Sequence, residues 1–165
     1  MNPTIKQMLN SVCVWIDATP LSQAIQNAPW VVPTVQTVHI LAIAALMASM
    51  LMINLRLVGM VGRDQPMAQV AGRFMPVIWW VLPVLLVSGI FLIIGEPARA
   101  LKNNIFQIKM LLVISAILVT LFFAAPPKKN PAYWDNRSGL GLLVALISVS
   151  LWVAIIFAGR WIAYF

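Results

Sequence analysis

Charged residues are scarce in this sequence, and acidic residues are the scarcest. Only four of the 165 residues are aspartate or glutamate, and 9% of the chain is charged, whereas about a quarter of the residues in a typical soluble domain are charged. Cysteine and histidine each occur once, as Cys13 and His39. The composition excludes an ordinary soluble domain, and the lone cysteine excludes an internal disulfide.

Motifs of several enzyme classes are missing as well. The sequence has no GxSxG, no Walker-type loop, no CxxC and no HExxH, so hydrolases, nucleotide-driven pumps and zinc enzymes have no support. No nucleic-acid-binding motif accompanies the net charge of +7. Basic loops that face anionic lipid headgroups account for this charge, so the expected partner is a lipid bilayer and not a nucleic acid.

Long apolar runs dominate what is present. Residues 30–59, 74–95, 105–125 and 140–162 form four windows without an acidic residue, and each is long enough to cross a bilayer, which takes about 20 residues. We therefore predict an all-α integral membrane protein, with a four-transmembrane-helix bundle over residues 29–165. Met8, Val12 and Trp15 recur at helical spacing, and Thr19-Pro20 is typical of a helix start. Residues 1–28 are accordingly predicted to form amphipathic interfacial helices.

The loops suggest an orientation. Lysines and arginines are more numerous in the first and third loops than on the opposite side, and such loops stay in the cytoplasm. We expect a multi-pass protein of a bacterial inner membrane with both termini in the periplasm.

His39 follows the start of the first window by nine residues, which is about 14 Å of helical rise. An ionisable side chain at this depth is a candidate functional residue. Three interpretations stay open. The imidazole can be neutral and hydrogen-bonded to Gln36, Ser88 or a backbone carbonyl, it can be an axial ligand of haem iron, or it can relay protons or bind copper.

A stripe of small residues, Ala42, Ala45 and Ser49, runs beside His39. Small side chains allow a helix or a flat cofactor to come close. We therefore predict His39 as a metal ligand, with Gln36, Ala42 and Ser88 as further cofactor-binding residues.

Lys109 is the other charged residue well inside a window. Its ammonium group can reach the headgroups by snorkelling. Alternatively, it lies on the same membrane side as His39 and nearer the surface, where the propionates of a His39-bound haem would point. Arg99 and Lys102 in the preceding loop would then assist through charge-assisted hydrogen bonds.

Four segments carry a family resemblance: TPLS at 19–22, WVVP at 30–33, NLRLVG at 54–59 and NIFQIK at 104–109. Together they resemble a bacterial membrane family catalogued as domain of unknown function 6644, over about residues 14–125. The family usually has an acidic residue where this chain has Asn54, and Thr-Gly where it has Ser88-Gly89. The resemblance implies the architecture but no activity.

A looser likeness connects the chain to the four-helix, haem-dependent protoporphyrinogen oxidases of bacterial membranes. These enzymes also pair a first-span histidine with an arginine at the end of that span and a lysine that opens a later one. The matching residues would be His39, Arg56 and Lys109. The likeness implies haem as a cofactor.

The predicted function is that of a membrane b-type cytochrome, with haem b ligated by His39, in electron transfer or membrane redox chemistry with a partner protein. The alternative is a cofactor-free scaffold or accessory subunit. A transporter is disfavoured because the windows lack acidic residues, and whether the protein is an enzyme stays open. One histidine per chain precludes bis-histidine ligation within it, so we expect a homo-oligomer, a dimer or a trimer, with the small-residue stripe at the contact.

Overall fold

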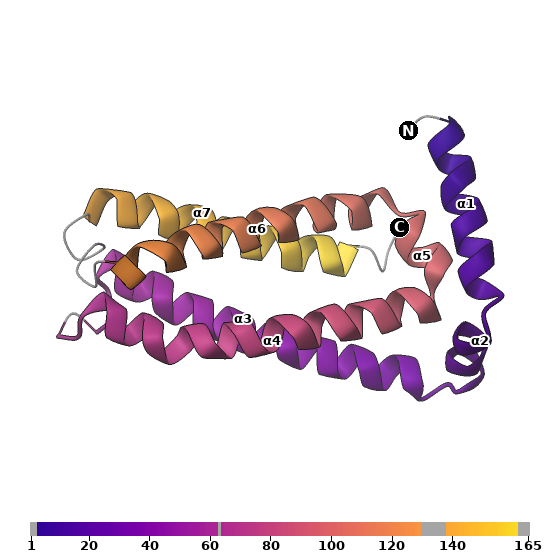
Figure 1. Ribbon diagram of the computed structural model, residues 1–165, viewed down its shortest axis with the longest axis horizontal. Helices are drawn as coiled ribbons and strands as arrows, with labels where there is room; N and C mark the ends of the chain where they lie inside the picture. Colours follow the sequence, from indigo (N-terminus) through magenta and orange to yellow (C-terminus); the bar gives the residue numbers. More distant parts are fainter. Residues whose placement is uncertain (1–2, 63, 130–137, 162–165) are drawn as a thin grey trace.

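The computed structural model describes residues 3–62, 64–129 and 138–161, and these residues are all-helical outside short connections (Figure 1). Four long helices are apolar enough to cross a membrane: α3 (Val31–Val58), α4 (Met67–Gly95), α6 (Asn104–Lys129) and α7 (Ser138–Trp161). Three shorter helices accompany them: α1 (Pro3–Asp17), α2 (Pro20–Asn27) and α5 (Pro97–Leu101). The predicted all-α, four-span architecture is confirmed, and the chain is a multi-pass membrane protein.

Local sequence signals set several helix ends. The Thr19 hydroxyl accepts a hydrogen bond from the Ser22 backbone N–H at 3.3 Å, and Pro20 occupies the first helical position of α2, as predicted. At the C-terminal end of α3, Gly59 adopts a φ of 78°. This left-handed conformation suits glycine and lets the Met60 N–H bond back to the Leu55 carbonyl at 2.9 Å.

Two helix boundaries differ from the sequence prediction. Helix α4 begins at Met67, where we predicted a start at residue 74, and α6 continues to Lys129, beyond the predicted end at residue 125. A hydropathy window detects only the part of a helix that matches the hydrocarbon layer. Backbone hydrogen bonding continues past that layer, so the helices extend beyond their apolar segments.

The long helices form two pairs, α3 with α4 and α6 with α7, and α3 also packs along α7 (Figure 1). The buried core lies between these helices and is concentrated in the half of the bundle where α3 ends and α4 begins. Its fully buried members include Leu46 and Ile53 of α3 and Met67 and Ile78 of α4. His39 and Lys109 lie in the other half.

The short helices gather at the end of the bundle where α3 begins and α4 ends (Figure 1). Ser22 on α2 is fully buried, and its hydroxyl donates to the Ile94 carbonyl of α4 at 2.7 Å. Gly95 allows this contact, because a Cβ there would lie 3.1 Å from the Ile25 side chain. Helix α1 keeps Met8 and Trp15 exposed. Its location at a membrane interface stays a prediction.

Candidate functional site

His39 lies on α3 with its ring turned towards α4. The imidazole is half-buried, and its Nδ1 is 2.7 Å from the Ser88 hydroxyl oxygen. Gly89, the next residue on α4, lies beside the ring: a Cβ at this position would be 3.7 Å from the imidazole Cε1. The Ser88-Gly89 pair therefore gives α4 both a polar partner for the imidazole and the space to admit it.

The proton positions at this contact follow from the neighbouring hydrogen bond. The Ser88 hydroxyl also lies 2.6 Å from the Val84 carbonyl oxygen, one helical turn earlier. A hydroxyl has one proton, and two oxygens at this distance need it between them, so Ser88 donates to Val84. The Ser88 oxygen must then accept from the His39 Nδ1–H. This assigns the Nδ1–H tautomer and leaves a lone pair on Nε2.

The Nε2 atom of His39 has no hydrogen bond within the part of the chain that the structure describes. A histidine held through Nδ1 with its Nε2 lone pair available is the usual arrangement of a metal ligand. The structure thus selects Ser88 from the three hydrogen-bond partners that the sequence left open. The same geometry also serves a histidine that merely joins two helices.

Lys109 reaches into the same half of the bundle from α6. Its half-buried side chain lies over Gly159 of α7, where a Cβ would be 3.4 Å from the Nζ atom. Lys109 lies near the start of α6, at the end of the bundle where α3 begins (Figure 1). No ion pair to Lys109 occurs among the described residues. His39 and Lys109 therefore lie at the same end of the bundle, each with a polar atom that lacks a partner there.

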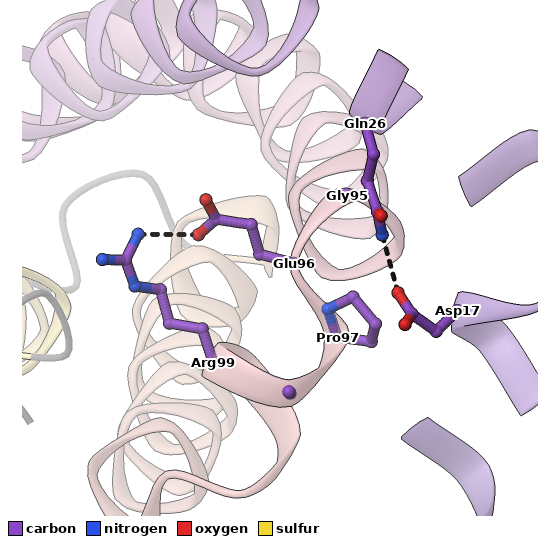
Figure 2. Close-up of a pocket in the computed structure, with 7 residues that line it drawn as sticks. Asp17, Gln26, Gly95, Glu96, Pro97 and Arg99 are labelled. Carbon is purple, nitrogen blue, oxygen red and sulfur yellow. Dashed lines mark hydrogen bonds and ion pairs between the residues drawn. The ribbon is translucent and has the colours of Figure 1, made fainter. Parts of the chain in front are cut away.

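Arg99 and Lys102 occupy a different environment. Arg99 is exposed, and its Nη1 lies 2.8 Å from Glu96 Oε2 (Figure 2). Lys102 is also exposed, immediately after α5. The structure places both in the surface segment that precedes α6 and brings neither into contact with His39.

The same region contains an open cleft of about 330 Å³. Its lining residues include Asp17, Gln26, Glu96 and Arg99 (Figure 2). The two carboxylates already have partners, because Gln26 Nε2 donates to Asp17 Oδ1 at 2.7 Å and Glu96 pairs with Arg99. Sequence reasoning missed the cleft, because its residues come from four separate helices, α1, α2, α4 and α5, and a connection between them. The hydrogen bond from Gln26 to Asp17 at this cleft links α2 to α1 at the end of the bundle.

The remaining predicted residues divide between the two faces of α3. Ala42 and Ser49 are buried within the chain, and the Ser49 hydroxyl donates to the Ala45 carbonyl at 2.9 Å. The expectation that this stripe offers a free surface to a second subunit is therefore wrong, because neighbouring helices of the same chain already cover it. Gln36 is exposed and makes no hydrogen bond to His39.

Other polar groups inside the bundle had not been predicted. Asn54 Nδ2 donates to the Ser148 hydroxyl at 3.3 Å and links α3 to α7, and both residues are buried. The buried indole N–H of Trp152 has no partner among the described residues. Within the same residues, no cluster of three or more His, Cys, Asp or Glu side chains is arranged to hold a metal ion.

Comparison with known proteins identifies one family. The model described as "Family of unknown function (DUF6644)" matches residues 12–165. This match confirms the resemblance carried by the four sequence segments and extends it through α7. No curated protein and no solved structure matches the chain.

Proposed function

We propose that this chain, which belongs to that family of unknown function, is a membrane b-type cytochrome whose haem b is ligated by His39. The observation that carries the proposal is the hydrogen-bond arrangement at the imidazole. Ser88 accepts from Nδ1–H because its own proton goes to Val84, and Nε2 keeps its lone pair. A neutral imidazole with a free lone pair in an apolar bundle has the donor chemistry that haem iron accepts.

The residues present favour haem over other metal centres. A structural zinc or copper site takes three or four protein ligands, and the described residues contain no such cluster. Haem supplies four nitrogen ligands itself and needs one protein ligand to be held. A single half-buried histidine is therefore enough for haem and too little for the other centres.

The chain's own residues would divide the work of holding the group. His39 would provide the iron ligand, and Ser88 would fix its ring orientation and tautomer. Gly89 would keep α4 close to the ring without obstructing it. The Lys109 ammonium, at the same end of the bundle, would pair with a propionate. Bound haem would supply one-electron transfer to and from a redox partner protein.

The proposal includes the cellular setting that the loop charges favour: a bacterial inner membrane, with both termini in the periplasm. It also includes a homo-oligomer, because each chain offers one histidine and a second copy would supply a further protein ligand.

Absorption spectroscopy of the purified protein tests the haem proposal. Protein produced in haem-replete cells and purified in detergent should show a Soret band, and His39→Ala should lose it while remaining folded and inserted. Thr37→Ala is the matched control, because Thr37 is exposed on the same helix and its hydroxyl donates to the Pro33 carbonyl of that helix at 2.8 Å. Full haem occupancy in His39→Ala would refute the proposal.

A cofactor-free scaffold is the second candidate, and one observation favours it. The His39–Ser88 hydrogen bond joins α3 to α4 without any additional group. In this case, the purified protein would be colourless even after haem-replete expression, and His39→Ala would lower its stability without a spectral change.

A further inference from the structure

Two adjacent tryptophans occupy an unusual depth in the bundle. Trp79 and Trp80 lie at the middle of α4, and their side chains are 46% and 78% exposed. Tryptophans of membrane proteins concentrate at the two interfaces, where the indole N–H meets water and headgroups. At mid-bilayer depth, neither water nor a lipid headgroup is available to the indole N–H. Neither indole N–H has a hydrogen bond in the described part of the chain.

The same face of α4 also carries a backbone acceptor without its helical donor. Pro83 lies inside the helix and is exposed. Proline has no N–H, so the carbonyl one turn earlier, that of Trp79, loses its helical hydrogen bond. Trp79 and Pro83 are four residues apart and lie on the same face of the helix, so the freed carbonyl belongs to that face. In hydrocarbon such a group must be satisfied by some donor, and a neighbouring helix is one source of it.

The described part of the chain does not cover this face. Pro76, Trp79, Trp80, Pro83 and Val87 fall within one side of α4 by their helical spacing, and all five are exposed; we call this side the α4 tryptophan face. The buried residues of α4, including Ile78 and Ser88, lie on the opposite side, where α3 packs. Donor and acceptor are both left to a partner outside the chain.

We infer that the α4 tryptophan face binds a second copy of this chain around a two-fold axis along the membrane normal. Such an axis keeps each residue at the same depth in both copies. The Trp80 indole N–H of one copy then lies level with the freed Trp79 carbonyl of the other, and the contact forms twice by symmetry. A surface that carries a donor and an acceptor at the same depth is complementary to itself.

This inference rests on the homo-oligomer in the proposed function and assigns its surface, in place of the buried stripe of α3. The observations that carry it, the two exposed tryptophans and Pro83, do not involve haem. The haem spectrum and the oligomeric state are measured separately, so either claim can fail while the other stands.

Dimerisation of the full chain in liposomes, followed by single-molecule photobleaching over a range of protein densities, tests the inference. Trp80→Phe keeps the ring but removes the N–H. It should weaken dimerisation about tenfold, because two symmetric hydrogen bonds of the strength found between membrane helices are lost. Pro83→Ala returns a helical donor to the Trp79 carbonyl and should weaken dimerisation as well.

The matched control is Trp161→Phe, which removes the N–H of another exposed tryptophan at the end of α7 and should leave the dimer unchanged. A wild-type protein that stays monomeric at every density would overturn the inference. So would a dimer or trimer that neither Trp80→Phe nor Pro83→Ala weakens, because its contact would then lie elsewhere.

Discussion

Replacing Ser88 with alanine would remove the acceptor that holds the His39 ring. The Nδ1–H, now 2.7 Å from the hydroxyl oxygen, would be left in the bundle without a partner. Hydrogen bonds between membrane helices contribute about 0.6 kcal/mol on average, and leaving a buried partner unsatisfied costs about 1–3 kcal/mol. Because the imidazole is only half-buried, we expect a loss of about 1 kcal/mol in the free energy of unfolding, near the lower end of that cost.

The same change should affect haem more strongly than it affects stability. Without Ser88, the imidazole proton can move to Nε2, which then has no lone pair for iron. Loss of a group that orients a metal ligand typically lowers affinity about 10- to 100-fold. Haem titration of the apoprotein measures the affinity, and thermal unfolding in detergent measures the stability.

Two companion variants make the Ser88 result interpretable. Ser88→Thr keeps a hydroxyl at this position and should restore both quantities. Ser115→Ala removes a hydroxyl that bonds only to its own helix, at the Leu111 carbonyl, and should change neither. If Ser88→Ala matched the wild type in both haem affinity and stability, the proton assignment at His39 would be wrong.

Three further variants test other parts of the structure. Lys109→Met should weaken haem retention or shift the midpoint potential, since an unpaired propionate in a low dielectric is costly. Arg73→Met, at an exposed residue near the start of α4 and at the opposite end of the bundle, should do neither in a redox titration. If the two variants behaved alike, Lys109 would be a snorkelling anchor. Gly95→Ala should destabilise the fold by about 1–3 kcal/mol, because its Cβ would lie 3.1 Å from a side chain of α2 and 3.2 Å from one of α3. A Cβ at Gly139 would meet nothing within 4 Å, so Gly139→Ala should not destabilise the fold. Thermal unfolding compares the stability of these two variants. With the native cysteine removed, Asp64→Cys in the first loop should react with an impermeant maleimide only from the cytoplasmic side; labelling of intact spheroplasts would contradict the orientation.

The candidate site was only partly accessible from the sequence. His39 and Lys109 stand out in the sequence because each is ionisable within an apolar window. Their partners do not stand out: Ser88 is separated from His39 by 49 positions, and Gly159 resembles any other glycine of α7. Arg99 had been grouped with Lys109 by proximity along the chain, but its partner in the structure is Glu96. Contacts between helices depend on rotation and depth, which the linear order of residues does not contain.

The sequence by itself determined the architecture. In hydrocarbon, a backbone must satisfy its own hydrogen bonds, so each run of about 20 apolar residues has a single solution, a helix. Only the tertiary structure decided which side of each helix faces inward. Lipid is as apolar as the protein interior, so the inner and outer faces of a membrane helix carry similar residues. Ala42 and Ser49 could therefore be read as an outer surface until packing showed them buried, and the exposed side of α4 with Trp80 became visible only once the helices were placed together.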